Sequence, residues 1–374
     1  MRPTDLLLLL EAVARAGDVE QRVATIVASL TRQEKLELMN GIGWDQWDIR
    51  DGYYVGNLVG APAKGLPPLK MHDAGQGFRT HDPRVVGTVT SWPCALALAS
   101  TFDRSSVTAF ANAAAAEFKT KGANVVLGPG LNIHRVARGG RNAEYLSGED
   151  PVLGAQLASS YVAAFHASGI MTVAKHYGFN QQETRRNTYD ALVDGEAKAL
   201  YYIPYKGAIE AGCMSIMCAY NKVNGHHACA SDELLGSDLR DGMAFQGFVV
   251  SDWAAAHQYH AGLDVAMPGS GVDDSGDPRG WYSADRLASL DEASLDAHIT
   301  RIVRAAVTVL DDESGCVPGS CQEELYATNA TSSEHKMIAR DLAADSIVML
   351  KNEGVLPLAT GSKIAVVGGA CAAV

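Results

Sequence analysis

Four short apolar runs in this sequence each end in a pair of side chains that could do chemistry. The pairs are His72-Asp73, Lys175-His176, Tyr220-Asn221 and Asp252-Trp253. Together they offer a nucleophile or base, cationic and neutral hydrogen-bond donors, and a flat aromatic face. Helix caps and ion pairs have no reason to recur at the end of each run. We therefore expect these side chains to gather in one site.

Asp252 has two interpretations when its sequence context is taken alone. It follows the apolar run at residues 247–251 and precedes Trp253. A carboxylate at the mouth of a cleft can act as a nucleophile or a base, and the indole ring of Trp253 offers a surface on which a sugar ring can stack. The alternative is an aspartate that caps the following helix.

Lys175, Arg141 and Asp73 are open to a similar choice. Lys175 could bind substrate hydroxyls, form a Schiff base or belong to a structural ion pair. Arg141 could hold a vicinal diol, or it could pin its loop to Glu149 or Asp150. Asp73 could likewise be a ligand or a structural residue. The residues alone leave these alternatives open.

The elements that would position these side chains alternate along the chain. Strands are expected at residues 69–72, 124–127, 171–175, 214–219, 247–251 and 263–267, and helices at residues 105–121, 154–168, 194–211 and 292–310. Strands separated by helices pair in parallel through crossovers, so the predicted fold class is α/β, a (β/α)8 TIM-like barrel. Active sites in such barrels lie at the carboxyl ends of the strands.

The alternating pattern stops near residue 311. Residues 311–333 are rich in Asp, Glu, Gly, Pro, Ser and Asn without periodicity, which is typical of an interdomain linker. A helix at 335–350 and an apolar strand at 363–368 are expected next, and two such elements cannot bury their own apolar faces. We predict a barrel with an N-terminal helical extension at 1–310, and the incomplete beginning of an α/β sandwich domain at 334–374.

Composition narrows the classes of partner. The 374 residues are 47% hydrophobic and carry a net charge of −12, with no long block of like charges. A nucleic acid or an anionic membrane surface is therefore not expected, whereas a neutral, hydroxyl-rich substrate is compatible. Leu6–Leu10 is too short for the apolar core of a signal peptide, which spans about 7–15 residues, and an amphipathic helix is the better interpretation.

The seven cysteines lack the CxxC spacing of a zinc site, so no metal is expected. Cys316 with Cys321 and Cys218 with Cys229 could form disulfides, or all could be free core residues. The Asn329-Ala-Thr sequence fits the N-glycosylation pattern. We expect an extracellular protein, although no signal peptide is evident and a cytoplasmic location is the alternative.

Six motifs in the chain resemble glycoside hydrolase family 3, which contains β-glucosidases and β-xylosidases. They are Gly128-Pro-Gly-Leu-Asn-Ile133, Gly140-Arg-Asn-Ala-Glu-Tyr145 with Gly148-Glu-Asp-Pro151, Lys175-His-Tyr-Gly-Phe-Asn-Gln-Gln-Glu183, Met217-Cys-Ala-Tyr-Asn-Lys-Val-Asn-Gly225, Gly247-Phe-Val-Val-Ser-Asp-Trp253 and Gly262-Leu-Asp-Val-Ala-Met-Pro268. They occur in the family's order. The resemblance runs from about Leu36 to the end of the sequence and implies a barrel followed by an α/β sandwich.

The resemblance also implies roles for individual residues. Asp252 matches the catalytic nucleophile, and Trp253 matches the residue that flanks it. The positions that match ligands of the innermost sugar are Asp73, Arg141, Lys175, His176 and Tyr220. The positions assigned to shaping the site are Asn180, Gln182, Glu183 and Arg186. No metal or organic cofactor is implied.

The function that follows from the resemblance is a retaining exo-β-glycosidase, with β-glucosidase as the leading interpretation and β-xylosidase as the alternative. In two-domain members the acid/base glutamate comes from the sandwich domain, so we expect it outside this chain. The partners expected are a small carbohydrate and the missing C-terminal sandwich domain or a complementing chain. A catalytically incomplete sugar-binding or structural subunit is the alternative outside the enzymes. A hexosaminidase is disfavoured, because the segment after Lys175 lacks that branch's Gly-His-Gly loop.

Overall fold

The structure is a computed structural model of the chain. It describes residues 17–43, 49–73, 75–79, 82–269, 280–311, 315–321 and 323–367. The helix expected around Leu6–Leu10 and the seventh cysteine, Cys371, lie outside the described residues. The first described segment, residues 17–29, is helical and leads into the barrel.

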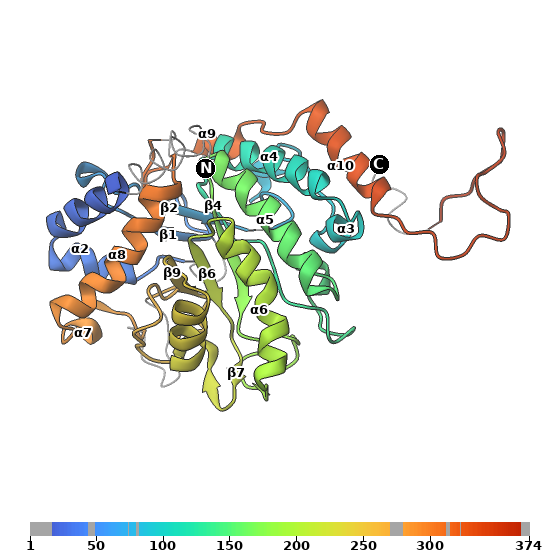
Figure 1. Cartoon of the computed structure of the whole chain (residues 1–374). Helices are drawn as coiled ribbons and strands as arrows, with labels where there is room; N and C mark the ends of the chain where they lie inside the picture. Colours follow the sequence, from blue (N-terminus) through green and yellow to red (C-terminus); the bar gives the residue numbers. More distant parts are fainter. Residues whose placement is uncertain are drawn as a thin grey trace, which may run out of the picture.

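A curled sheet of six strands forms the centre of the molecule (Figure 1). In spatial order the strands are β1 Gly56–Leu58, β2 Leu69–His72, β3 Val125–Val126, β4 Met171–Tyr177, β6 Ser215–Cys218 and β9 Phe248–Ser251. Neighbours from β2 to β9 pair in parallel, whereas β1 runs antiparallel to β2. Parallel pairing through helical crossovers is what the alternating sequence pattern predicts.

Isolated bridges close this sheet into a ring. Val250 on β9 bridges Val265, Ala266 bridges Asn40, and Ile42 bridges Asn57 on β1. The seam is tight, because a Cβ atom on Gly41 would lie 2.9 Å from the carbonyl oxygen of Ala266. The six strands and two bridged segments together confirm the predicted TIM-like barrel. The predicted strand at 263–267 contributes its pairing at this seam.

Helices surround the ring, and α4, α5 and α6 lie side by side on one flank in Figure 1. In chain order, the α-helices from α2 to α8 are α2 Arg32–Met39, α3 Ala95–Ser100, α4 Arg104–Thr120, α5 Pro151–Ala167, α6 Gly195–Glu210, α7 Ala284–Leu287 and α8 Glu292–Val309. An aspartate caps the start of α4, α5, α6 and α8, its carboxylate accepting backbone N–H bonds of the first turn. The four predicted barrel helices match these bounds to within three residues.

Shorter elements complete the fold. They are the helical turns η1 Pro62–Lys64, η2 Pro83–Val85, η3 Asn142–Glu144, η4 Ala228–Ala230 and η5 Glu233–Gly242, and a small sheet of β5 Asp190–Ala191, β7 Lys222–Val223 and β8 His226–His227. The disulfide Cys218–Cys229 joins β6 to η4, and the disulfide Cys316–Cys321 closes a short loop beyond the barrel helices. Among the described cysteines, Cys94 and Cys213 are free.

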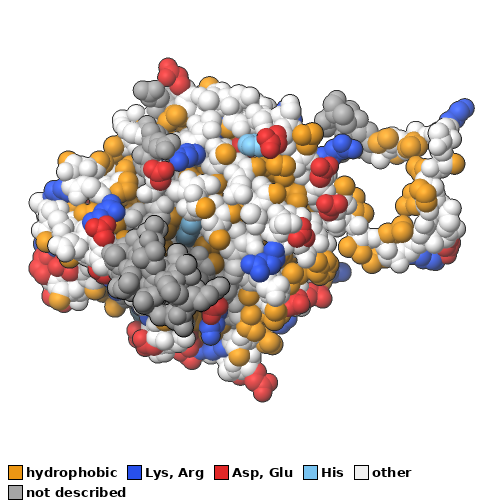
Figure 2. Space-filling model, turned by 45° about the horizontal axis from the view of Figure 1, so that its top comes forward, with side chains coloured by type: hydrophobic (Ala, Val, Ile, Leu, Met, Phe, Trp, Pro, Cys, Tyr) orange, Lys and Arg blue, Asp and Glu red, His pale blue; other side chains and the backbone are white. Residues whose placement is uncertain are grey.

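The chain beyond the barrel differs from its prediction. Helix α9 spans Glu323–Ala327, and α10 spans Ser333–Asp345, where the predicted helix extended to residue 350. The strand predicted at 363–368 is wrong over its described part, since residues 362–367 have no regular secondary structure. A strand needs a neighbour to satisfy its backbone N–H and C=O groups, and no described segment of this chain supplies one there. Figure 2 shows the hydrophobic side chains of this segment along a loop that projects from the body.

Candidate active site

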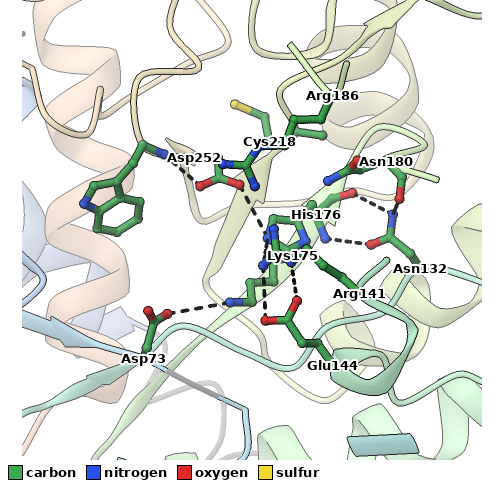
Figure 3. A network of polar contacts seen from close by, with 12 residues as sticks. Asp73, Asn132, Arg141, Glu144, Lys175, His176, Asn180, Arg186, Cys218 and Asp252 are labelled. Carbon is green, nitrogen blue, oxygen red and sulfur yellow. Dashed lines mark hydrogen bonds and ion pairs between the residues drawn. The ribbon is translucent and has the colours of Figure 1, made fainter. Parts of the chain in front are cut away.

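A cavity of about 330 Å³ opens at the carboxyl ends of the strands, and all seven predicted site residues line it. Figure 3 labels Asp73, Arg141, Lys175, His176 and Asp252 among them. The walls of the cavity are Val55, Asp73, Arg79, Leu127, Arg141, Glu144, Lys175, His176, Glu183, Arg186, Met217, Tyr220, Asp252 and Trp253. The volume falls at the lower end of the range of small-molecule pockets, about 300–1,000 Å³. The structure thus brings together residues that are 180 positions apart in sequence.

Asp252 stands directly after β9 and is 7% exposed. Its backbone N–H donates to the carbonyl of Cys218 at 3.1 Å, and its Oδ1 accepts the N–H of Trp253 at 2.8 Å. No helix begins at this point of the described chain, which turns instead at residues 253–254. The helix-cap alternative is therefore wrong.

The second carboxylate oxygen of Asp252 faces the imidazole of His176 and has no hydrogen-bond partner within the described part of the chain. The Nε2 atom of His176 lies 3.4 Å from Asp252 Oδ2 and 3.3 Å from Arg141 Nη2. Its Nδ1 atom lies 3.0 Å from the hydroxyl of Tyr145. Because a guanidinium can only donate, we infer that Nε2 accepts from Arg141 and that Nδ1 carries the proton.

β4 and a neighbouring loop fix the positions of Lys175 and His176. The side chain of Asn132 accepts the N–H of His176 at 2.8 Å and donates to the carbonyl of Asn180 at 3.0 Å. The N–H of Lys175 donates to the carbonyl of Pro129 at 2.9 Å. This interlocked backbone holds both side chains toward the cavity (Figure 3).

Asp73, which follows β2, is paired with two cations. Its Oδ1 lies 3.8 Å from Lys175 Nζ, and its Oδ2 accepts from Arg79 Nη2 at 3.0 Å. Lys175 thus belongs to an ion pair, as one interpretation expects, and it also lines the cavity. Arg79 was not among the predicted site residues, although its position six residues after Asp73 in the same loop could have indicated it.

Arg141 pairs with Glu144, and not with Glu149 or Asp150, the two residues considered from the sequence. Its guanidinium contacts the carboxylate of Glu144, and Nη1 lies 3.8 Å from Oε1 of Glu183. Asp150 instead caps α5. The i,i+3 spacing of Arg141 and Glu144 was the available signal for this pair.

Tyr220, two residues after β6, packs beneath a cation. The guanidinium of Arg186 lies 4.1 Å from the centre of the Tyr220 ring, a cation–π contact. Arg186 Nη1 also lies 3.0 Å from Oε2 of Glu183. Arg186 and Glu183 line the cavity together with Tyr220, so they form part of its wall.

The pKa shifts of the cavity groups have opposite signs. Burial raises the pKa of the Asp252 carboxyl, although the charges of Arg141 and Lys175 oppose this. Burial also acts to raise the pKa of Asp73 and Glu144, but Lys175 and a neighbouring arginine outweigh it, so both fall below the ordinary range. Burial, followed by the repulsion of Arg141 and Lys175, lowers the pKa of His176. The imidazole is therefore neutral near pH 7.

Opposite charges balance around the cavity. The carboxylates are Asp73, Glu144, Glu183 and Asp252, and the cations are Arg79, Arg141, Lys175 and Arg186. Paired charges with several exposed hydrogen-bonding atoms suit a neutral ligand rich in hydroxyl groups better than an ion. In the described ranges no three His, Cys, Asp or Glu side chains form a metal-binding group. Over the same ranges, every helix is too short or too polar to cross a lipid bilayer.

Comparison with known proteins places this site in context. The family description "Glycosyl hydrolase family 3 N terminal domain" matches residues 62–268. The sequence is 35% identical to "Probable beta-glucosidase L" of Emericella nidulans over 91% of this chain and 46% of that protein. It is 32% identical to "Thermostable beta-glucosidase B" of Acetivibrio thermocellus over 92% of this chain and 44% of that protein.

Solved structures give the same result. A β-D-glucoside glucohydrolase from Trichoderma reesei aligns with a TM-score of 0.80 at 30% identity, over 92% of this chain and 47% of that one. β-Glucosidase 3B from Thermotoga neapolitana, solved in complex with glucose, aligns with a TM-score of 0.76 at 30% identity, over 90% of this chain and 48% of that one. The chain spans slightly less than half the length of the relatives it matches.

Proposed function

Since the chain belongs to glycoside hydrolase family 3, we propose that it is the barrel portion of a retaining β-glucosidase with Asp252 as the nucleophile. The observation that carries the proposal is the Oδ2 atom of Asp252, which has no hydrogen-bond partner among the described residues and lies in a cavity lined by hydrogen-bonding side chains. β-Glucosidase relatives and a glucose-bound structural neighbour support glucose as the sugar.

The proposed reaction begins with attack by Asp252 Oδ2 on the anomeric carbon. A bond forms between that oxygen and the carbon while the bond from the carbon to the leaving oxygen breaks. The leaving oxygen takes a proton from a second carboxyl group, which we assign to a domain outside this chain. Water, deprotonated by the same group, then releases the sugar from Asp252.

In this proposal the other residues of the cavity bind the sugar and stabilise the transition state. The proposed ligands of the innermost sugar's hydroxyls are Asp73, Arg141, Lys175, His176 and Tyr220, with a hydroxyl taking the place of Arg141 at His176 Nε2. Tyr220 and Trp253 flank the nucleophile. These groups stabilise the reaction to the extent that their hydrogen bonds tighten as the ring flattens toward an oxocarbenium ion.

The C-terminal part of the chain is assigned to a second domain in the same proposal, with the barrel at 1–310, a linker at 311–333 and the second domain beginning at residue 334. Its exposed apolar side chains support this, because monomers rarely leave so many apolar groups in water. The exposed set is Ile347, Val348, Met349, Leu350, Val355, Leu356, Leu358, Ile364, Val366 and Val367. Further polypeptide, in the same chain or a complementing one, would cover them.

An extracellular location completes the proposal. Two disulfides are typical of proteins that fold in an oxidising compartment, and the Asn329 glycosylation pattern lies at an exposed position.

The test is covalent labelling by an activated 2-deoxy-2-fluoro-β-glucoside with a dinitrophenolate leaving group. Such a leaving group departs without an acid, so the chain can be tested as it stands. Intact mass should rise by one fluoroglucosyl unit, and the peptide that carries the label should contain Asp252. Faster labelling by the corresponding xyloside would favour a β-xylosidase. Glucose binding by calorimetry without any labelling would favour a sugar-binding subunit.

A further inference from the structure

A tyrosine of the linker, Tyr326 on α9, is buried against residues that neighbour the cavity wall in sequence. It is 4% exposed although it lies in the polar segment 311–333, outside the predicted barrel. A linker that only tethers two domains has no need to bury a large aromatic ring. The position of this ring therefore calls for a function.

The Tyr326 ring packs in an aromatic cluster at the carboxyl end of β2 and the amino end of β1. Its centre lies 5.6 Å from that of Tyr54, 6.1 Å from that of Phe78 and 6.5 Å from that of His72. The Phe78 contact is edge-on at 72°, and His72 and Phe78 are themselves 4.1 Å apart. These separations are in the range of favourable aromatic pairs.

Each residue whose ring packs against the Tyr326 ring is the chain neighbour of a residue in the cavity wall. The neighbouring pairs are Tyr54 with Val55, His72 with Asp73, and Phe78 with Arg79. The Cα atoms of adjacent residues are joined by one rigid, planar peptide group. A shift of this cluster therefore moves Asp73 and Arg79, which are hydrogen-bonded to each other at 3.0 Å.

Hydrogen bonds on both sides fix Tyr326 in place. Its hydroxyl donates to the carbonyl of Tyr53 at 2.9 Å. The fully buried Lys121 donates from Nζ to the carbonyls of Tyr326 and Thr328, both at 2.6 Å. Arg84 also lies over the ring, 5.5 Å from its centre. The linker is thus fastened to the barrel at this point.

We propose that Tyr326 is a positioning residue of the sugar pocket, acting through His72 and Phe78 to hold in place Asp73, a proposed ligand of the innermost sugar, and Arg79, which pairs with Asp73. The proposal rests on the function proposed above. It assigns to the linker a part in substrate affinity, separate from its connection to a second domain. According to this proposal, Tyr326 does not contact the substrate itself.

The experiment measures inactivation by the activated 2-fluoro-β-glucoside in the wild-type chain and in Tyr326→Leu and Tyr326→Phe. The concentration for half-maximal inactivation should rise about tenfold or more in Tyr326→Leu, because misplaced ligands weaken binding. The maximal rate per active site should change by less than about threefold, because Asp252 stays in place. Tyr326→Phe keeps the ring and should lie within about threefold of wild type in both constants.

Phe245→Leu is the matched control, since Phe245 is also buried and aromatic but lies before the start of β9, away from the cavity wall. It should lower stability without changing the half-maximal concentration. An unchanged value in Tyr326→Leu, or an equal rise in Phe245→Leu, would overturn the proposal. Failure of the wild-type chain to become labelled would instead reject the function proposed for Asp252. If Tyr326→Leu does not fold, Tyr326→Met offers the same test with a larger apolar side chain.

Discussion

His176 Nε2 and Asp252 Oδ2 face each other across 3.4 Å, and the contact with Arg141 leads us to infer that Nε2 carries no proton. Arg141 donates to this imidazole nitrogen, and burial keeps the ring neutral by lowering the pKa of His176. The carboxylate oxygen therefore keeps its lone pairs for a ligand. A neutral imidazole that already accepts a hydrogen bond is also a poor proton donor, so in the proposed mechanism this pair would supply the nucleophile and the acid would come from elsewhere.

Asp252→Asn should abolish labelling by the 2-fluoro-glucoside, with a loss of at least about 10³-fold, because an amide oxygen is a far weaker nucleophile than a carboxylate. Stability should be unchanged or higher, since burial already disfavours the charge of Asp252. Mass spectrometry of the intact protein and urea unfolding give both results. Asp150→Asn, at a helix cap that asparagine also fills, is the control. Undiminished labelling at another carboxylate would reject Asp252.

As the pH is lowered, the labelling rate should begin to fall at a higher pH than it would for an aspartate with an ordinary pKa. The reaction needs the carboxylate, and burial raises the pKa of Asp252, so the rate falls as the pH drops through that raised value. Because Arg141 opposes the rise, Arg141→Gln should move the acid limb of the profile to still higher pH. The ratio of maximal rate to half-maximal concentration, measured between about pH 4 and pH 8, is the readout. Arg304→Gln, which breaks an outlying pair with Glu20, should leave the limb in place. A shift to lower pH in Arg141→Gln would contradict the assignment.

Folding stability should depend on His72 in acid. Burial lowers the pKa of His72 from 6.5 to about 4, so between these values the unfolded chain binds a proton that the folded chain does not. Above pH 6.5 the neutral His72 costs the folded state nothing. As the pH falls from 6.5 toward 4, the free energy of unfolding decreases by about 3 kcal/mol because of this residue. In His72→Leu the fall in unfolding free energy between pH 7 and pH 4.5 should be smaller than in wild type by about 2–3 kcal/mol. Equal slopes of unfolding free energy against pH would show that other groups dominate.

The two disulfides should differ in their effect on the active site. Cys218 and Cys229 are 11 positions apart, and Cys316 and Cys321 are 5 apart. Replacing each pair with alanine should cost about 3 and about 2 kcal/mol from loop closure. Only the first should slow labelling, because the carbonyl of Cys218 accepts the N–H of Asp252. Urea unfolding and labelling rates check both statements, and equal rates in the two variants would contradict the second.

The meeting of the seven predicted side chains could be anticipated from the sequence for a simple reason. Asp73 and Asp252 each follow an apolar strand, Lys175 lies near the end of one, and parallel strands of a barrel carry their carboxyl ends to one face. Strand alternation also predicts the helices, because aspartates such as Asp103 and Asp194 mark their first turns. Local signals of this kind need no knowledge of distant contacts.

Other features depend on contacts that no local pattern contains. Arg186 reaches Tyr220 from a loop 34 residues earlier, and Tyr326 reaches Phe78 across 248 residues. The strand expected at 363–368 failed for the opposite reason, since its apolar pattern is sound but strand formation requires a pairing partner. Propensity sets what a segment can form, and the available neighbours decide what it does form.

The seam of the ring determines the order in which the protein can assemble. Asn40 and Ala266 are 226 positions apart, and closing a loop of that length costs about 5 kcal/mol of chain entropy. The other strand pairs join shorter stretches, so we expect the seam to form late, after residue 266 has been synthesised. Trp253 and Gly56 meet across this seam, where a Cβ atom on Gly56 would lie 2.9 Å from the indole. An intermediate with every strand pair except the seam would hold Asp252 on its sheet yet lack the opposite wall, so sugar binding should appear only in the last folding step.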